Sequence, residues 1–354
     1  MPGPAFDGFL LLSFGGPEGP DDVVPFLRNV TAGRGVPDER LAQVAEHYQH
    51  FGGVSPINAH NRALLEALGT EFRAHDIDLP LYWGNRNWQP FVVDAVRAMR
   101  DDGVRRALVL ATSATASYSS CRQYRDDLAQ ARAAAGDDAP ELVKLRHFFD
   151  HPDYVAAHAA GLAAALATLP DDVRDEARLV FTAHSIPVAM NDSSGPDANG
   201  LYAAQQRETA RLVAEAVGGT GAAFDLVWQS RSGPPQVPWL EPDVNDHLRA
   251  LALTGVRAVV VCPTGFVSDH LEVLWDLDNE ARATATELGM AFARAATPGT
   301  HPAFVAMVRE LVQEELTGAP PRSAGLLGLC GIECPPGCCP APRRATQPDS
   351  ASAL

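Results

Sequence analysis

The stretch that decides the fold reads VVVCPTGFVSDHLEVLWDLDNEAR and spans residues 259–282. It opens with three consecutive valines, the pattern of a short strand buried on both faces. A Cys-Pro-Thr-Gly turn then interrupts the strand. We predict that a helix follows from Ser268, with Ser268 or Asp269 as its N-cap. A buried strand that leads through a turn into a helix is the repeating unit of a parallel α/β sheet.

The predicted helix carries three carboxylates, Glu272, Asp276 and Glu280, at intervals of four residues. This spacing places them along one helix face, where each like-charged pair costs roughly 0.2–0.5 kcal/mol unless a cation relieves the repulsion. One explanation is the solvated acidic face of an amphipathic helix. The position just past a buried strand, beside His270, favours a path for a cation, because ligands of open α/β sheets bind outside the carboxyl ends of the strands.

The composition is that of a soluble globular protein, with 46% hydrophobic and 20% charged residues. No apolar run reaches the roughly 18–20 residues that span a bilayer, and the N-terminus lacks a secretory signal. We therefore expect a cytoplasmic protein without a transmembrane segment. The net charge of −16 argues against nucleic acid as a partner. Lys144 is the only lysine, so arginine, whose guanidinium forks onto carboxylates, is the expected partner of an acidic ligand.

Strand and helix patterns alternate along the chain, and the alternation restarts after residue 170. We predict strands at residues 9–14, 81–83, 105–111, 142–145, 178–182, 224–229, 257–262 and 289–294. This order predicts an α/β protein with two doubly wound domains, residues 1–170 and 171–325, whose parallel sheets leave a ligand site in the cleft between them. A Cys-rich tail follows at residues 326–354, and we expect its last residues, 341–354, to be disordered.

Five segments resemble the ferrochelatases, the enzymes that insert ferrous iron into a porphyrin in haem synthesis. In chain order they are LLLSFGGPEG, FGGVSPIN, TAHSIP, WQSRSGPPQVPWLEPDV and GFVSDHLEVLWDLDNE. The resemblance runs roughly from Phe9 to Leu316. It implies two Rossmann-like domains of the chelatase type, with the active site in the cleft between them.

His184 lies at the end of a predicted strand, where its side chain would project into the cleft, although a lone histidine is more often structural. The TAHSIP segment is similar to the catalytic histidine motif of the family, which implies that His184 faces Glu272 across the porphyrin. Metal insertion must remove two pyrrole protons and deliver a divalent cation. A neutral imidazole can accept a proton or bind iron near neutral pH, and a carboxylate can take the other role. The sequence leaves the division of roles open.

We expect metal contacts from His184, Glu272, Asp276 and Glu280. The resemblance places the loop of Phe14 under the porphyrin. Five polar residues lie in loops after strands or between helices, from which they can reach the propionates: Arg34, Ser55, Arg86, Tyr118 and Tyr124. Arg231 is a further candidate donor to a propionate. A site that distorts the flat ring needs apolar walls, and the candidates are Phe14, Phe51, Trp88, Trp228, Trp239 and Trp275. Phe14 stands where some family members have a tyrosine near the metal, and it cannot ligate iron.

Four of the six cysteines, Cys330, Cys334, Cys338 and Cys339, lie within ten residues. In a cytosolic protein such a group binds a metal more often than it forms disulfides. It is similar to the 2Fe–2S cluster that some ferrochelatases carry, and four thiolates are the usual ligands of that cluster. A Cys₄ zinc site is the alternative. We expect all four ligands in the tail rather than at Cys121 or Cys262, with His158 as a remote substitute.

We predict a ferrochelatase that inserts Fe²⁺ into coproporphyrin III to form coproheme, like the bacterial branch of the family. The alternatives are a protoporphyrin IX ferrochelatase and a haem or metal carrier with an iron-sensing cluster. A proton acceptor beside a row of carboxylates favours the enzyme over the carrier. The expected partners are the porphyrin, ferrous iron and, transiently, neighbouring enzymes of haem synthesis, and we expect a monomer.

Overall fold

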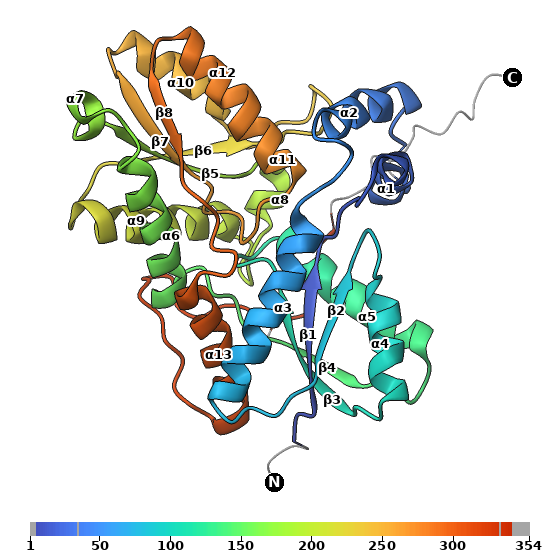
Figure 1. Cartoon of the computed structure of the whole chain (residues 1–354). Helices are drawn as coiled ribbons and strands as arrows, with labels where there is room; N and C mark the ends of the chain where they lie inside the picture. Colours follow the sequence, from blue (N-terminus) through green and yellow to red (C-terminus); the bar gives the residue numbers. More distant parts are fainter. Residues whose placement is uncertain (1–4, 34, 333, 342–354) are drawn as a thin grey trace, which may run out of the picture.

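The computed structural model describes residues 5–33, 35–332 and 334–341 and contains two four-stranded parallel sheets (Figure 1). The first sheet has the order β2-β1-β3-β4 and the second has the order β6-β5-β7-β8. The strands are β1 (Gly8–Ser13), β2 (Leu81–Asn85), β3 (Arg106–Ala111), β4 (Glu141–Lys144), β5 (Arg178–His184), β6 (Asp225–Gln229), β7 (Ala258–Cys262) and β8 (Ala291–Arg294). The predicted α/β class with parallel sheets is confirmed.

Helices connect the strands and cover the sheets. In the first half they are α1 (Val23–Val30), α2 (Asp38–His50), α3 (Ile57–Ala74), α4 (Val92–Asp101) and α5 (Gln123–Ala135). They continue with α6 (Pro152–Leu166), α7 (Asp171–Arg174), α8 (Val188–Asp192), α9 (Leu201–Gly218), α10 (Val244–Leu253), α11 (Leu271–Val273), α12 (Arg282–Glu287) and α13 (Pro302–Thr317). Two segments are π-helical, η2 (Tyr118–Arg122) and η3 (Leu274–Ala281). No helix among the described residues has the length and apolarity needed to traverse a bilayer.

Successive residues of the central strands enter opposite cores, as the period of two along a strand requires. In β1, Phe9 and Leu11 pack with α3 and α13, whereas Leu10 and Leu12 pack with α4 and α5. All six residues of β1 and all five of β7 are buried. A strand that is covered on both faces needs an uninterrupted apolar sequence, and this explains the runs that predicted these strands.

The two halves repeat one another beyond the strand order. A π-helix follows the third strand of each half, η2 after β3 and η3 after β7. Each half also passes from its fourth strand into a helix that begins with a His-Pro pair. The Nδ1 atoms of His151 and His301 accept hydrogen bonds of 3.2 Å from the backbone N–H groups of Asp153 and Ala303. The chain therefore contains two copies of one structural plan.

The last helix of the chain packs in the first half. Phe304 and Met307 of α13 are buried in the core that includes Phe9 and Leu11, and Figure 1 shows α13 beside α3. Conversely, Leu162 of α6 is buried against the second sheet. Helices α6 and α13 therefore join the two halves. The proposed domain division at residue 170, which follows the order of the chain, remains a prediction.

The helix after β7 differs from the prediction. It begins at Leu271 with His270 as its N-cap, rather than at Ser268, and it becomes π-helical at Leu274. A π-helix has i→i+5 hydrogen bonds and a wider turn than an α-helix, and such segments are frequent at functional sites. A carboxylate spacing of four fits either helix, so the sequence pattern could not distinguish them.

Gly265 allows the turn after β7 to pass directly over the end of β5. A Cβ atom at Gly265 would lie 2.6 Å from Cβ and 2.7 Å from Cα of Ala183, so the backbones would have to separate. We expect Gly265→Ala to destabilise the protein by about 1–3 kcal/mol, measured as a lower midpoint of urea unfolding. Gly19→Ala is the matched control, because a Cβ at Gly19 meets no atom within 4 Å. Equal midpoints for both variants would contradict this account.

Candidate functional site

His184 and Glu272 form an ion pair at the carboxyl ends of β5 and β7. His184 is the last residue of β5, and its Nδ1 lies 2.5 Å from the carbonyl oxygen of Ser185. That carbonyl can only accept, so Nδ1 carries a proton. His184 Nε2 lies 3.5 Å from Glu272 Oε2. The side chains are 34% and 50% exposed, which leaves both accessible to a ligand.

The pair stabilises its own charges. Burial by itself would lower the pKa of His184, but the hydrogen bond and charge of Glu272 outweigh it, so the pKa is raised. Burial would raise the pKa of Glu272, but the bond from His184 holds it at about 2. Each partner therefore favours the charged form of the other. Their 3.5 Å contact leaves no room for a planar ring between them, which corrects the expectation that the two residues face each other across a porphyrin.

The two other carboxylates of the row lie in different environments on η3. Asp276 accepts hydrogen bonds from Gln229 Nε2, at 3.2 Å, and from Ser230 Oγ. Burial raises the pKa of Asp276 to about 7; the bond from Ser230 opposes this rise and the charge of Glu272 adds to it. Glu280 is exposed and accepts a 2.7 Å hydrogen bond from Trp275 Nε1. The row therefore leads from an exposed carboxylate to the ion pair.

His270 does not share this polar environment. Its ring packs edge-on against Phe266, with 5.0 Å between the ring centroids. Burial lowers the pKa of His270, although the charge of Glu272 opposes the change. A neutral imidazole at the N-cap of α11 therefore lies close to the ion pair without adding a positive charge.

The acidic helix, formed by α11 and η3, carries Glu272, Asp276 and Glu280. Helices α1 and α2 pack over its start. Leu271 is buried in a cluster with Phe26 and Tyr48. Trp275 stacks on the ring of His47, with 3.9 Å between the centroids and 6° between the planes. Two of the predicted walls, Phe14 and Trp88, each contact Phe26 edge-on, and a third, Phe51, contacts Trp275. Trp228 is buried against Tyr202, and Trp239 is half-buried after β6.

The predicted porphyrin contacts fall into two groups. Phe14 is 37% exposed, and Tyr118 is half-buried at the start of η2. In contrast, Arg86 is buried, stacks over Tyr124 and pairs with Asp127, so its charge is already neutralised. Ser55 and Tyr124 are also buried, Arg231 donates to two backbone carbonyls of its own loop, and Arg34 lies outside the described residues.

Three contacts around the pair were not predicted. Tyr202 donates its hydroxyl to the carbonyl oxygen of His184 at 2.7 Å. Gln229 and Ser230 bind Asp276 from the end of β6. The sequence offered a signal for these two, since they end a strand that is adjacent to β5 in the sheet. It offered none for Tyr202, which comes from the first turn of α9.

The tail cysteines come together between residues of both halves, against Ala116 and Leu201. Cys338 and Cys339 have their sulfur atoms 3.7 Å apart, and Cys339 Sγ accepts a 3.2 Å hydrogen bond from the backbone N–H of Gly195. Cys330 and Cys334 pack in the same cluster. Cys121 lies beside Cys334 and the two share a proton, which lowers the pKa of Cys121 and raises that of Cys334. The thiols of Cys121 and of the four tail cysteines therefore lie close to one another, and all five are free.

The other candidate ligands lie elsewhere. Cys262 ends the buried strand β7, and His158 packs edge-on against Tyr154 inside α6. Burial lowers the pKa of His158 to about 3, so this residue is a neutral part of the core. Neither residue belongs to the cluster of tail cysteines.

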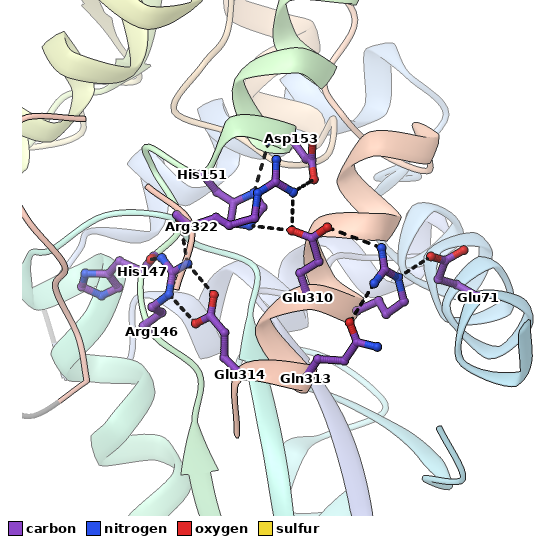
Figure 2. Close-up of polar contacts among 10 residues, drawn as sticks. Glu71, Arg146, His147, His151, Asp153, Glu310, Gln313, Glu314 and Arg322 are labelled. Carbon is purple, nitrogen blue, oxygen red and sulfur yellow. Dashed lines mark hydrogen bonds and ion pairs between the residues drawn. The ribbon is translucent and has the colours of Figure 1, made fainter. Parts of the chain in front are cut away.

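A second group of potential metal ligands, His151, Asp153 and Glu310, lies where the start of α6 and the middle of α13 meet the segment around Arg322 (Figure 2). Arg322 Nη1 already bridges the carboxylates, at 2.9 Å from Asp153 and 2.5 Å from Glu310. Because His151 Nδ1 accepts a hydrogen bond, its proton lies on Nε2, which faces Glu310 at 3.4 Å. A protonated nitrogen cannot ligate a metal. The ion pairs of this group therefore hold the segment around Arg322 against α6 and α13.

Comparisons with known proteins identify the family. The sequence model of the family Ferrochelatase matches residues 6–316. The coproporphyrin III ferrochelatase of Nocardia farcinica is 59% identical over 347 residues, which cover 96% of this chain and 98% of the relative. The enzyme of the same description from Mycolicibacterium smegmatis is 61% identical over 318 residues, covering 90% and 92%. The solved structure of SirB from Bacillus subtilis with Fe³⁺ is similar in fold, with a TM-score of 0.52 at 11% identity over 89% of this chain and 97% of that one.

The ion pair predicts how His184 should titrate. In the wild-type protein its pKa should lie above the ordinary value of 6.5, as measured by NMR of the imidazole C–H resonances. In Glu272→Gln, His184 is still buried but has lost the negative charge that raises its pKa. The pKa of His184 should therefore fall below 6.5. Stability from His184 should be fully present below pH 6.5 and be lost as the pH rises through the raised pKa. An unchanged pKa in Glu272→Gln would contradict the pairing.

Proposed function

The chain belongs to the ferrochelatase family and inserts iron into coproporphyrin III, and from this premise we propose that His184 and Glu272 carry out the proton and metal transfers. The observation that carries this assignment is the contact of His184 Nε2 with Glu272 Oε2 at 3.5 Å. Both groups act on the same face of the porphyrin. Nδ1 is occupied by the carbonyl of Ser185, so Nε2 is the nitrogen that exchanges protons.

The pair must lose a proton before it can accept one from a pyrrole. Fe²⁺ that arrives at Glu272 supplies positive charge beside the imidazolium, which lowers the pKa of His184 and favours release of its proton. Neutral His184 is then the base for one pyrrole N–H. Glu272 hands over the cation and, as the carboxylate that this leaves free, accepts the second pyrrole proton. Iron insertion and proton removal are coupled in this way, because the negative charge of Glu272 is shared first with a proton and then with iron.

The carboxylate row brings the cation to the pair. Exposed Glu280 is the first acceptor, and Asp276 is the relay between Glu280 and Glu272. Because the pKa of Asp276 is about 7, this group is partly protonated near neutral pH and can exchange a proton for a cation. A carboxylate that is always ionised in a buried site would hold Fe²⁺ more tightly and release it more slowly.

The porphyrin contacts of the proposal are Phe14, Arg34, Ser55, Arg86, Tyr118 and Tyr124. Exposed Phe14 is an apolar wall of the porphyrin site. It has no atom that can bind iron, so the proposed metal ligands all come from the second half of the protein. Arg86 reaches a propionate only by sharing its guanidinium with Asp127, so its role is to orient a carboxylate rather than to supply an unpaired charge.

We further propose that Cys330, Cys334, Cys338 and Cys339 hold a 2Fe–2S cluster, with Cys121 as the neighbouring fifth thiol. The residues fit an anionic group. Lys144 is buried close to these thiols, and the carbonyl of Leu145 is its hydrogen-bond acceptor. Burial lowers the pKa of Lys144 and the charges of Cys121, Cys334 and Cys330 oppose this change, so a negative group at the thiols would favour the ammonium form. The cluster would add order to a tail whose apolar residues Leu326 and Ile332 are 83% and 55% exposed.

The catalytic assignment predicts the loss of chelation in His184→Ala. Removing a general base costs about 10²–10⁴-fold in rate, and the fold should be retained because the side chain borders the cleft. The assay is initial-rate conversion of coproporphyrin III with Fe²⁺ under anaerobic conditions. His75→Ala, which changes a half-exposed histidine at the end of α3, should keep the wild-type rate. Turnover by His184→Ala within twofold of wild type would refute the assignment.

The cluster predicts about two irons and two acid-labile sulfides per chain, with colour before any porphyrin is added. Cys338→Ser should lose the colour and lower the thermal midpoint, while Cys262→Ala should keep the full iron content. Zinc in place of iron and sulfide would refute the cluster and leave the chelatase assignment intact. A full cluster in Cys330→Ser would make Cys121 a ligand in its place.

A further inference from the structure

Asp276 is the carboxylate of the row that a neighbouring strand holds. Gln229 Nε2 donates to Asp276 Oδ2 at 3.2 Å, and Ser230 Oγ donates to the same oxygen. Glu280 is bound instead by Trp275 of its own helix. The central member of the row is therefore held to the end of β6, whereas the outer member is bound within η3.

The backbone of Ser230 is in a conformation that favours glycine. Its φ is 61°, which is disfavoured for any residue with a Cβ atom. Glycine would satisfy this turn without strain, but it has no hydroxyl to donate. Backbone strain of this kind is kept where the surrounding structure needs a particular side chain, and the contact that Ser230 makes is with Asp276.

Gln229 joins the same carboxylate to the catalytic strand. It is fully buried and lies opposite His184 in the register of β5 and β6. Its carbonyl oxygen accepts a 2.7 Å hydrogen bond from the N–H of Ser185, the residue whose own carbonyl binds His184 Nδ1. The backbone of Gln229 therefore positions the histidine loop, while its side chain positions Asp276.

We propose that Gln229 and Ser230 are positioning residues that hold Asp276 in line with the His184–Glu272 pair, so that Asp276 passes the cation inward. The inference rests on the proposed function of the acidic row. The proposal predicts a higher KM for Fe²⁺. It predicts little change in kcat, because the chemical step after iron has bound is not affected.

The test compares Ser230→Gly with wild type in steady-state assays that vary Fe²⁺ at saturating coproporphyrin III. Glycine relieves the backbone strain and removes the hydroxyl. We expect the KM for Fe²⁺ to rise about tenfold, since a hydrogen bond to a charged group is lost, with kcat within twofold and an equal or higher unfolding midpoint. Gln229→Met, which removes the amide at similar length, should change KM in the same direction.

Two controls separate positioning from general effects. Ala198→Gly relieves a similar left-handed residue, φ 48°, away from the row and should leave KM unchanged. In an Asp276→Asn background, Ser230→Gly should add no further rise in KM, because the carboxylate that it positions is gone.

Three results would overturn the proposal: an unchanged KM in Ser230→Gly, a fall in kcat alone, or an equal rise in KM in the Asp276→Asn background. These outcomes are distinct from failure of the catalytic assignment. That assignment fails if His184→Ala retains turnover, whatever Ser230→Gly does.

Discussion

The site depends on how three carboxylates are kept together on one short helix. Each is stabilised in a different way: Glu272 by the charge of His184, Asp276 by a raised pKa and two donors from β6, and Glu280 by exposure and the indole of Trp275. These contacts reduce the repulsion among the three carboxylates. Because each carboxylate is stabilised differently, the proposed cation path would pass through three different electrostatic environments.

The fold supplies that arrangement through adjacent parallel strands. β5 and β7 are paired, so His184 and the turn before α11 meet at one edge of the sheet. Close contact between Gly265 and Ala183 brings that turn over β5. Arg294 at the end of β8 then anchors the acidic helix, with bonds of 3.0 Å to Asp269 and 2.9 Å to Asp278. The site is therefore fixed to three strands of the same sheet.

The sequence could predict the features that depend on period and order. The apolar runs located the strands, and the position at strand ends indicated His184 and Glu272. It could not predict the π-helix, because a spacing of four carboxylates also fits an α-helix. It also did not predict that Asp127 would neutralise Arg86, or that Cys121 would lie beside the tail, because both contacts join residues far apart in the chain. Packing of α13 on the first sheet escaped prediction for the same reason.

The repeated plan explains why one half carries the ionisable chemistry. β1 and β5 occupy equivalent places in their sheets, but β1 leads into Phe14 and β5 ends with His184. The π-helices η2 and η3 are likewise equivalent, yet η2 has the sequence YSSCR, whereas η3 carries Asp276 and Glu280. The carboxylates of η3 therefore have no counterpart in η2. An apolar ring and a hydrated cation need opposite surroundings, and a duplicated scaffold can offer an apolar strand end in one half and an ionisable strand end in the other.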